Sequence, residues 1–164
     1  MITILNTIPS REQLLTLYDS VGWSAYTEEP DRLIRAVASS LAVFTAWDGP
    51  HLAGLLRAVG DGETILYIQD LLVAPVCQRR GIGRRLVEAC LAQYPHVRQK
   101  VLLTDTTSKN LAFYRACGFV PSEDFGCTAL LRMEHNKGKK GRPYGRPFCC
   151  IRVYLTGRVR RRGR

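Results

Sequence analysis

Three apolar runs follow one another closely in the middle of the chain, at residues 41–47, 52–59 and 64–73. Short segments rich in Gly, Asp and Pro separate them, at residues 48–50 and 60–62. Runs of this length joined by turns this short predict antiparallel hairpins. The middle of the chain is therefore expected to form an antiparallel meander, which argues against a doubly wound parallel sheet.

The N-terminal part predicts a short edge strand and two helices. Residues 2–5 form the apolar start of the chain. Ser10 is suited to cap a first helix, because its hydroxyl can accept a backbone hydrogen bond. Pro30 suits the first turn of a second helix, and the preceding acids Glu28 and Glu29 suit the positive end of its dipole.

The part after the meander predicts helices alternating with strands. A glycine turn leads into a helix with an apolar stripe near residues 86–94, and residues 97–104 form the next strand. Ser108 is expected to cap a further helix, which Gly118 ends. Strands at 119–120 and 127–133 complete the expected order. The fold class is α/β (α+β), with a mixed, mostly antiparallel sheet and helices on both faces.

The net charge of +10 is confined to one end of the 164 residues. Residues 1–135 hold 13 basic and 14 acidic residues, whereas residues 136–164 hold 11 basic residues and no acid. We therefore expect a near-neutral domain at 1–135 and a basic tail at 136–164. The tail is expected to be either a non-native extension or partly disordered, with one strand in its middle. The tail leaves a second hypothesis open, a non-catalytic protein that binds nucleic acid or an acidic partner.

The six cysteines form no C-x-x-C pair, and the three histidines are isolated, which argues against a metal site. No apolar run reaches the roughly 18 residues that a membrane helix needs. The first ten residues lack a secretory signal pattern. These features predict reduced cysteines in a cytoplasmic protein without membrane association.

The segment at residues 78–85 is the most informative for function. An apolar strand runs into a tight turn and then into a helix, and a helix N-terminus of this kind binds phosphate through its free N–H groups. Gly81 and Gly83 allow close backbone approach. Four arginines add positive charge for a polyphosphate: Arg79, Arg80, Arg84 and Arg85.

Other phosphate loops fit this segment less well. A triphosphatase loop would need G-x-x-x-x-G-K-[ST], which is absent. A dinucleotide fingerprint would need a third glycine where Leu86 stands, although Asp105 is suitably spaced for the ribose. A simple strand-to-helix turn with a solvated basic face also remains open.

Two motifs together resemble GNAT-type N-acetyltransferases, which bind acetyl-coenzyme A. Residues 78–83 resemble the Q/R-x-x-G-x-G/A motif of that family, and residues 110–119 resemble its N-x-x-x-x-F/Y-Y-x-x-x-G-F pattern with shortened spacing. The resemblance covers residues 1–133 and includes the order of the elements. It implies acetyl-coenzyme A as co-substrate and no metal.

The resemblance implies where the coenzyme binds. The pyrophosphate would lie on the backbone N–H groups of the turn, which comprises Gln78, Arg79, Arg80, Gly81, Ile82, Gly83 and Arg84. The pantetheine arm would pair with the strand residues Leu71, Leu72 and Val73, at a bulge that splays the sheet. Asn110 would orient this arm, and Phe113 and Tyr114 complete the coenzyme-binding set.

Acetyl transfer to an amine needs a carbonyl-polarising donor, an acid and a base. The expected donor is the N–H of Leu72, and Tyr114 is the acid by resemblance, with a core aromatic as the alternative. Asp70 is a candidate base or a structural hydrogen-bonding group, because adjacent strand residues such as Gln69 and Asp70 point to opposite faces. Three other carboxylates stay open as bases: Glu28, Glu29 and Glu63.

The loop after the first helix is expected to contribute to the acceptor pocket. Trp23 and Tyr26 lie there, where they either pack against an amine substrate or plug an edge of the core. The expected partner is a small-molecule or peptide amine, and the resemblance is compatible with a homodimer. Binding to nucleic acid is the less favoured alternative.

Overall fold

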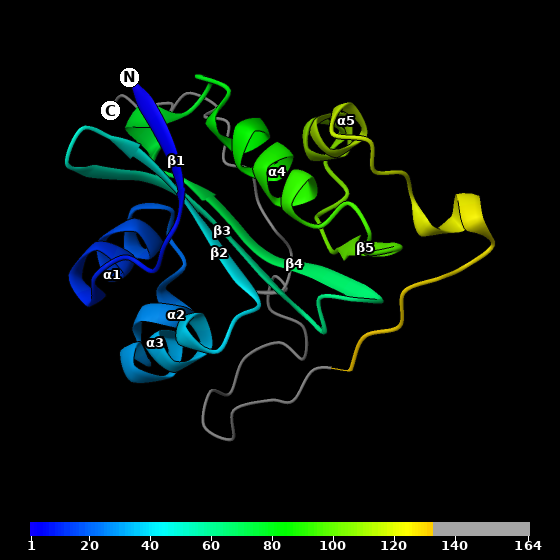
Figure 1. The fold of residues 1–164 in the computed structure, drawn as a ribbon, viewed down its shortest axis with the longest axis horizontal. Coiled ribbons are helices and arrows are strands. Elements are labelled where there is room, and N and C mark those ends of the chain that lie inside the picture. Colours follow the sequence, from blue (N-terminus) through cyan, green and yellow to red (C-terminus); the bar gives the residue numbers. More distant parts are fainter. Residues whose placement is uncertain (133–164) are drawn as a thin grey trace, which may run out of the picture.

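The computed structural model describes residues 1–132, which form a five-stranded sheet with helices on both faces (Figure 1). The strands lie side by side in chain order: β1 (Ile2–Asn6), β2 (Ala42–Asp48), β3 (His51–Gly60), β4 (Ile65–Val73) and β5 (Gln99–Leu102). All neighbours are antiparallel except β4 and β5, which are parallel. The mixed, mostly antiparallel sheet, the meander and the edge strand are confirmed.

The helices divide into two layers, one on each face of the sheet (Figure 1). One layer consists of α1 (Arg11–Ser20), α2 (Ser24–Thr27) and α3 (Pro30–Ala38), and the other of α4 (Ile82–Gln93) and α5 (Ser108–Ala116). Two 3-10 turns lie after β4 and after α5: η1 (Pro75–Cys77) and η2 (Ser122–Phe125). The one-turn helix α2 was not predicted.

Local capping explains where the helices begin and end. Ser10 accepts a hydrogen bond from the N–H of Gln13, whose side chain accepts one from the N–H of Ser10. Thr107, not Ser108, caps α5, because its hydroxyl accepts from the N–H of Asn110. Gly118 follows α5 with a φ of +89°, a conformation that favours glycine.

Each face of the sheet has its own apolar core. The α4 side packs Leu56, Ile68, Leu71 and Val73 of the sheet against Leu86 and other residues of α4. The α1 side packs Val43, Leu55 and Leu72 against Leu14, Leu17 and Leu33. Side chains of β4 therefore alternate between two buried layers, as expected for a strand covered on both faces.

A bulge in β4 interrupts this alternation. Opposite β4, Arg57 pairs with Asp70 while the next residue, Ala58, pairs with Ile68, so that Gln69 is an extra residue. Gln69 and Asp70 both hydrogen-bond to tyrosines of the α1–α2 layer. The expectation that these two side chains point to opposite faces is therefore wrong, because a bulge shifts the two-residue period by one.

The strands expected after α5 are wrong within the described residues. Residues 119–120 and 127–132 form no strand, and Leu130 and Leu131 are exposed. Pro121 lacks an N–H and is followed at once by η2, which ends any extended run there. Residue 133, the boundary at 135 and the whole tail at 136–164 lie outside the described residues.

Tyr18→Phe is expected to lower the free energy of unfolding by about 1.5–3 kcal/mol, because the Tyr18 hydroxyl donates a buried hydrogen bond to the Asp70 carboxylate. Tyr94→Phe is the matched control, since the Tyr94 hydroxyl makes two long hydrogen bonds, donating to the Leu41 carbonyl at 3.5 Å and accepting from the exposed Gln93 side chain at 3.4 Å. Urea unfolding curves measure both changes. If both variants lost the same free energy of unfolding, the buried Tyr18 hydrogen bond would not be the stabilising interaction expected here.

Candidate active site

The edge of β4 that faces β5 is only partly paired. Pairing with β5 runs from Ile65 to Ile68, and beyond that point the described residues supply no strand along this edge. Backbone groups of a strand are strong donors and acceptors that require partners when they are buried. The unpaired stretch therefore offers a place where an extended ligand can bind as an added strand.

The strand register decides which residues face this open edge. The N–H of Ala74 donates to the carbonyl of Ala53 at 2.9 Å, so these two form a hydrogen-bonded pair of the β3–β4 ladder. Pair types alternate along an antiparallel ladder, which directs the N–H of Leu72 toward β3. Leu71 and Val73 instead face the open edge. The N–H of Leu72, the expected donor, therefore faces β3 and not the open edge.

The turn after β4 presents a free helix N-terminus. Arg79 and Gly81 have φ values of +63° and +74°, and this left-handed backbone turns the chain into α4. The first helical hydrogen bond runs from the N–H of Arg85 to the carbonyl of Gly81. The N–H groups of residues 82–84 precede that bond and have no partner within the helix, so they form an anion-binding end.

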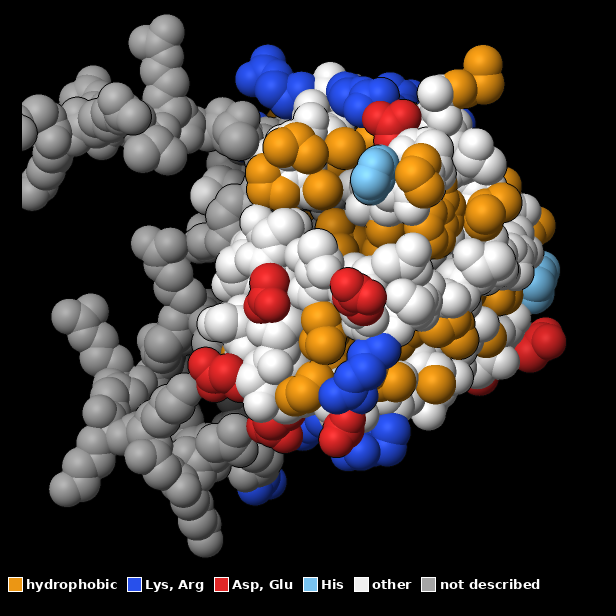
Figure 2. Space-filling view, turned by 90° about the vertical axis from the view of Figure 1, so that its left-hand side faces the viewer, with side chains coloured by type: hydrophobic (Ala, Val, Ile, Leu, Met, Phe, Trp, Pro, Cys, Tyr) orange, Lys and Arg blue, Asp and Glu red, His pale blue; other side chains and the backbone are white. Residues whose placement is uncertain are grey.

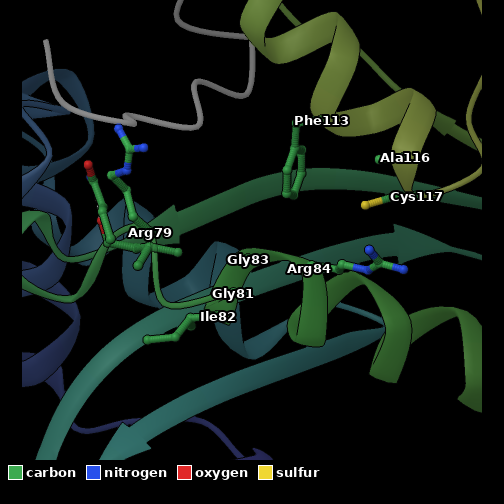
Figure 3. Close-up of a pocket in the computed structure, with 10 residues that line it drawn as sticks. Arg79, Gly81, Ile82, Gly83, Arg84, Phe113, Ala116 and Cys117 are labelled. Carbon is green, nitrogen blue, oxygen red and sulfur yellow. Dashed lines mark hydrogen bonds between the residues drawn. The ribbon is translucent and has the colours of Figure 1, made fainter.

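A cleft of about 300 Å³ lies between this turn and α5 (Figure 3). Phe113 points from α5 toward Gly83, with Arg79 at one end of the cleft and Arg84 at the other. The lining residues are Val73, Gln78, Arg79, Gly81, Ile82, Gly83, Arg84, Phe113, Ala116 and Cys117. Most of the residues predicted to bind the coenzyme are brought together here, and Ala116 and Cys117 are additions.

The four arginines of the turn differ in their surroundings. Arg79 and Arg84 line the cleft, and Arg84 also pairs with Glu88 at 2.7 Å. Arg80 instead pairs with Asp48 at 2.7 Å, and Arg85 donates to the carbonyl of Ile2. Arg79 and Arg84 therefore lie in the cleft, whereas Arg80 and Arg85 are directed to groups of the protein outside it.

Tyr114 is almost fully buried, and its hydroxyl has no hydrogen-bond partner among the described residues. The ring contacts Phe113 and Phe119 edge-on and packs in the same cluster as Leu71 and Val73. Burial raises the pKa of Tyr114 well above its ordinary value, so the phenol keeps its proton. A buried donor without an acceptor is rare, so this hydroxyl requires a partner such as a water or a ligand atom.

Asn110 is held by the loop that precedes α5. Its Nδ2 donates to Asp105 at 3.0 Å, and Thr107 donates to the same carboxylate oxygen at 2.6 Å. Asn110 is only 3% exposed and does not line the cleft. Its expected contact with pantetheine stays a prediction.

Asp70 is fully buried on the opposite face, with its carboxylate engaged by several groups. Oδ2 accepts hydrogen bonds from Arg57 Nε at 2.5 Å and from the Tyr18 hydroxyl at 2.8 Å. Tyr26 approaches Oδ1 at 3.5 Å. Burial and the charge of Asp70 raise the pKa values of both tyrosines, which therefore stay protonated donors.

Arg57 is the partner that the sequence analysis missed. Burial is the largest single effect and lowers the pKa of Arg57, but the charge of Asp70, its hydrogen bond and the contributions of Tyr18 and Tyr26 together raise it. Its only available signal was a lone arginine inside the apolar run at residues 52–59, because a buried cation requires a buried partner. The other candidate bases, Glu28, Glu29 and Glu63, are exposed.

Trp23 and Tyr26 belong to the aromatic part of the α1-side core. Their rings stack with centroids 5.6 Å apart, and both contact Tyr18. Trp23 is only 8% exposed, which supports its reading as a core residue, whereas Tyr26 is half-buried. Only Tyr26 of this pair therefore retains substantial surface for an acceptor.

The charges of the described surface do not form one broad basic area on the face in Figure 2. Lys and Arg side chains lie at its upper edge and again in its lower part, and Asp and Glu side chains lie among them in both places as well as across the middle. Within residues 1–132, no group of three or more His, Cys, Asp or Glu could hold a metal ion. The helices of this part are also too short or too polar to cross a membrane.

Gly81→Ala is expected to destabilise the fold by about 1 kcal/mol, because an L side chain is strained at a φ of +74°. Gly83→Ala is the contrasting control. Gly83 is helical, and an added Cβ would lie 3.5 Å from Phe113, an ordinary contact, so this change is expected to stabilise by up to about 1 kcal/mol. Thermal unfolding measures both variants. A change of the melting temperature in the same direction for both would contradict the left-handed backbone assigned to Gly81 and the helical backbone assigned to Gly83.

Comparisons with known proteins agree with this geometry. The model of the acetyltransferase (GNAT) family matches residues 9–119. A GNAT-family acetyltransferase from Streptococcus pneumoniae is 37% identical, with a TM-score of 0.74 over 83% of this chain and 100% of its own. AAC(6')-Iy, solved with a bisubstrate analogue of CoA, is 16% identical with a TM-score of 0.59 over 82% and 99% of the two chains.

A curated relative is the chloroplastic serotonin N-acetyltransferase 2 of rice, Oryza sativa subsp. japonica. It is 30% identical over 112 residues, which make up 66% of this chain. This chain spans about half (55%) of the length of the rice protein. With a family model that matches most of the described residues, the chain belongs to the GNAT family of acetyltransferases.

Proposed function

We propose that the protein transfers an acetyl group from acetyl-coenzyme A to a primary amine, by direct attack in a ternary complex. One observation carries the proposal. Three features belong to one side of the sheet: the open edge of β4, the free N-terminus of α4, and the Tyr114 hydroxyl, which has no partner within residues 1–132. A coenzyme with a pyrophosphate, two amides and a thioester would satisfy all three features.

The pyrophosphate would bind at the turn between β4 and α4. The N–H groups of Ile82, Gly83 and Arg84 offer hydrogen bonds at the positive end of the helix dipole. Arg79 and Arg84, which line the cleft, would add charge-assisted contacts. Gly83 has no side chain on the cleft side, which lets the ligand approach the backbone between Val73 and Phe113.

The pantetheine arm would pair with the open edge of β4. Leu71 and Val73 direct their backbone groups toward this edge, and the Val73 carbonyl now accepts a hydrogen bond from the Gln78 side chain at 3.0 Å. Main-chain pairing of this kind supplies affinity without requiring particular side chains. The N–H of Leu71 is our candidate for polarising the acetyl carbonyl.

Acetyl-coenzyme A, when bound, supplies a thioester whose carbonyl carbon an amine nitrogen can attack with release of a thiolate. Tyr114 would donate its proton to that sulfur, since burial keeps the phenol protonated. The proton of the amine would pass to water. We do not assign it to Asp70, because that carboxylate is fully buried and holds Arg57 and Tyr18.

The acceptor is proposed to be a primary amine that reaches the β4 edge from the side of Tyr26. The name of the rice relative makes serotonin the first amine to test. A panel of serotonin, tyramine, spermidine, an aminoglycoside and a lysine peptide, with release of free thiol as the readout, measures acceptor choice. Absence of thiol release with every amine, together with no thermal stabilisation by acetyl-coenzyme A, would overturn the proposed function.

Tyr114→Phe is expected to lower kcat by about 100-fold or more, the usual contribution of a general acid, while the coenzyme affinity changes little. The ring packing is retained in this variant, so a lower kcat would result from the loss of the proton that the hydroxyl donates. Phe119→Leu, at the other ring that contacts Tyr114, is the packing control and should retain most activity. An unchanged kcat in Tyr114→Phe would remove the acid role.

Gly83→Leu is expected to weaken binding of acetyl-coenzyme A at least about tenfold, because its side chain would fill the cleft beside Phe113. Gly83→Ala, whose Cβ makes only an ordinary contact, is the matched control and should bind within about threefold of the parent. Isothermal titration measures both affinities. Equal affinity in the leucine variant would show that the coenzyme does not occupy this cleft.

A further inference from the structure

The bulge of β4 coincides with a buried ion pair that the acetyl-transfer chemistry does not use. Arg57 stands directly opposite Asp70, at the last pair before the register shifts. Their side chains meet at 2.5 Å and are 8% and 0% exposed. The pair therefore lies at the one place where β4 carries an extra residue.

The same place ends the pairing between β4 and β5. The parallel ladder stops at Ile68, and the extra residue is Gln69. Bulges terminate pairing and redirect the residues that follow them. The bulge thus lies where the open edge starts. It also determines that the backbone groups of Leu71 and Val73, and not those of Leu72, are directed toward this edge.

A regular ladder without the bulge would reverse these directions. Continuing the Ala58–Ile68 register would place Asp70 opposite Leu56, in the apolar cluster under α4. An ionised carboxylate there would lack Arg57 and Tyr18, and burying an unpaired charge is strongly unfavourable. Leu72 would then face the open edge in place of its two neighbours.

Groups from the α1–α2 layer hold the carboxylate on its observed face. Tyr18 donates to the oxygen that Arg57 also contacts, and Tyr26 bridges Asp70 and Gln69 at 3.5 Å each. Both bulge residues are therefore tied to the same layer. An apolar pair at these positions would pack as well but would not distinguish the two registers.

We propose that Arg57, Asp70 and Tyr18 are positioning residues that fix the register of β4 beyond the bulge and thereby direct the backbone of Leu71 and Val73 into the coenzyme slot. The effect on the coenzyme rests on the proposed function, whereas the effect on the register does not. Asp70 in this role acts on the coenzyme through the strand and does not touch the reacting atoms.

The central test replaces the ion pair by apolar residues in Arg57→Met/Asp70→Leu, which leaves no unpaired buried charge. The double variant is expected to be more stable than either single variant, yet to bind acetyl-coenzyme A at least about tenfold more weakly than the parent. Arg11→Met/Asp31→Leu is the matched control, because it removes an exposed ion pair between α1 and α3 and should keep the parent affinity. Parent affinity in a folded Arg57→Met/Asp70→Leu protein would overturn the proposal.

A second readout needs no coenzyme. Leu56 and Leu71 are opposite in the observed register and form a non-hydrogen-bonded pair, so their Hα atoms should give a strong nuclear Overhauser effect. In the double variant this signal is expected to weaken and Leu56 to contact residue 70 instead. An unchanged Leu56–Leu71 signal would overturn the proposal even if affinity fell.

Asp70→Asn provides the same readout if the double variant does not fold, since it keeps the side-chain shape and removes the charge. Its Leu56–Leu71 signal is expected to weaken, and full retention would again overturn the register role. If the parent protein neither binds acetyl-coenzyme A nor releases thiol, the proposed function fails while the register result still stands. The two failures are thus distinguishable.

Discussion

The organisation of the candidate site depends on the incomplete pairing of β4. This strand is paired with β3 along most of its length, but with β5 only from Ile65 to Ile68. Backbone N–H and carbonyl groups within a folded protein require partners. Beyond Ile68 the described residues supply no strand for this edge, although the Val73 carbonyl accepts a hydrogen bond from the Gln78 side chain. The free N-terminus of α4 adds a second set of unpaired donors where β4 ends.

The two faces of β4 have different physical roles. The α4 side is an apolar cluster that contains the Tyr114 hydroxyl, for which the described part of the chain offers no hydrogen-bond partner. The α1 side contains a buried carboxylate that is engaged by Arg57 and two tyrosines. The desolvation of a buried ion pair offsets much of its attraction, so such a pair is weak evidence for stability. Its position at the bulge instead favours a role in choosing one register over another.

Local signals were enough to predict much of the fold. The turns at 48–50 and 60–62, the Ser10 cap and the glycine turn before α4 each act within a few residues, and the structure has them as expected. The bulge could not be predicted, because it depends on which residue of β3 stands opposite Asp70. The direction of Leu72 and the partner of Asp70 follow from that pairing. The strand expected at 127–133 is wrong within the described residues for a similar reason. A sequence pattern can favour an extended backbone, but it does not show whether a neighbouring strand is available for pairing.

The Tyr114 hydroxyl lies between two parts of the candidate site: the motif at residues 110–119, which the sequence analysis identified, and the open edge of β4, whose register it did not predict. Leaving a buried hydroxyl without an acceptor is unfavourable by about 1–3 kcal/mol, which a core aromatic could avoid as phenylalanine. Tyr114 packs in one cluster with Leu71 and Val73, which face the open edge. Within residues 1–132 no strand pairs with them on that side, and the Val73 carbonyl accepts a hydrogen bond from the Gln78 side chain. A single extended ligand with amides along its length and an acceptor atom at its end would satisfy the strand and the phenol together. The motif at residues 110–119 indicates the tyrosine, but only the register of β4 shows which backbone groups share the slot with it.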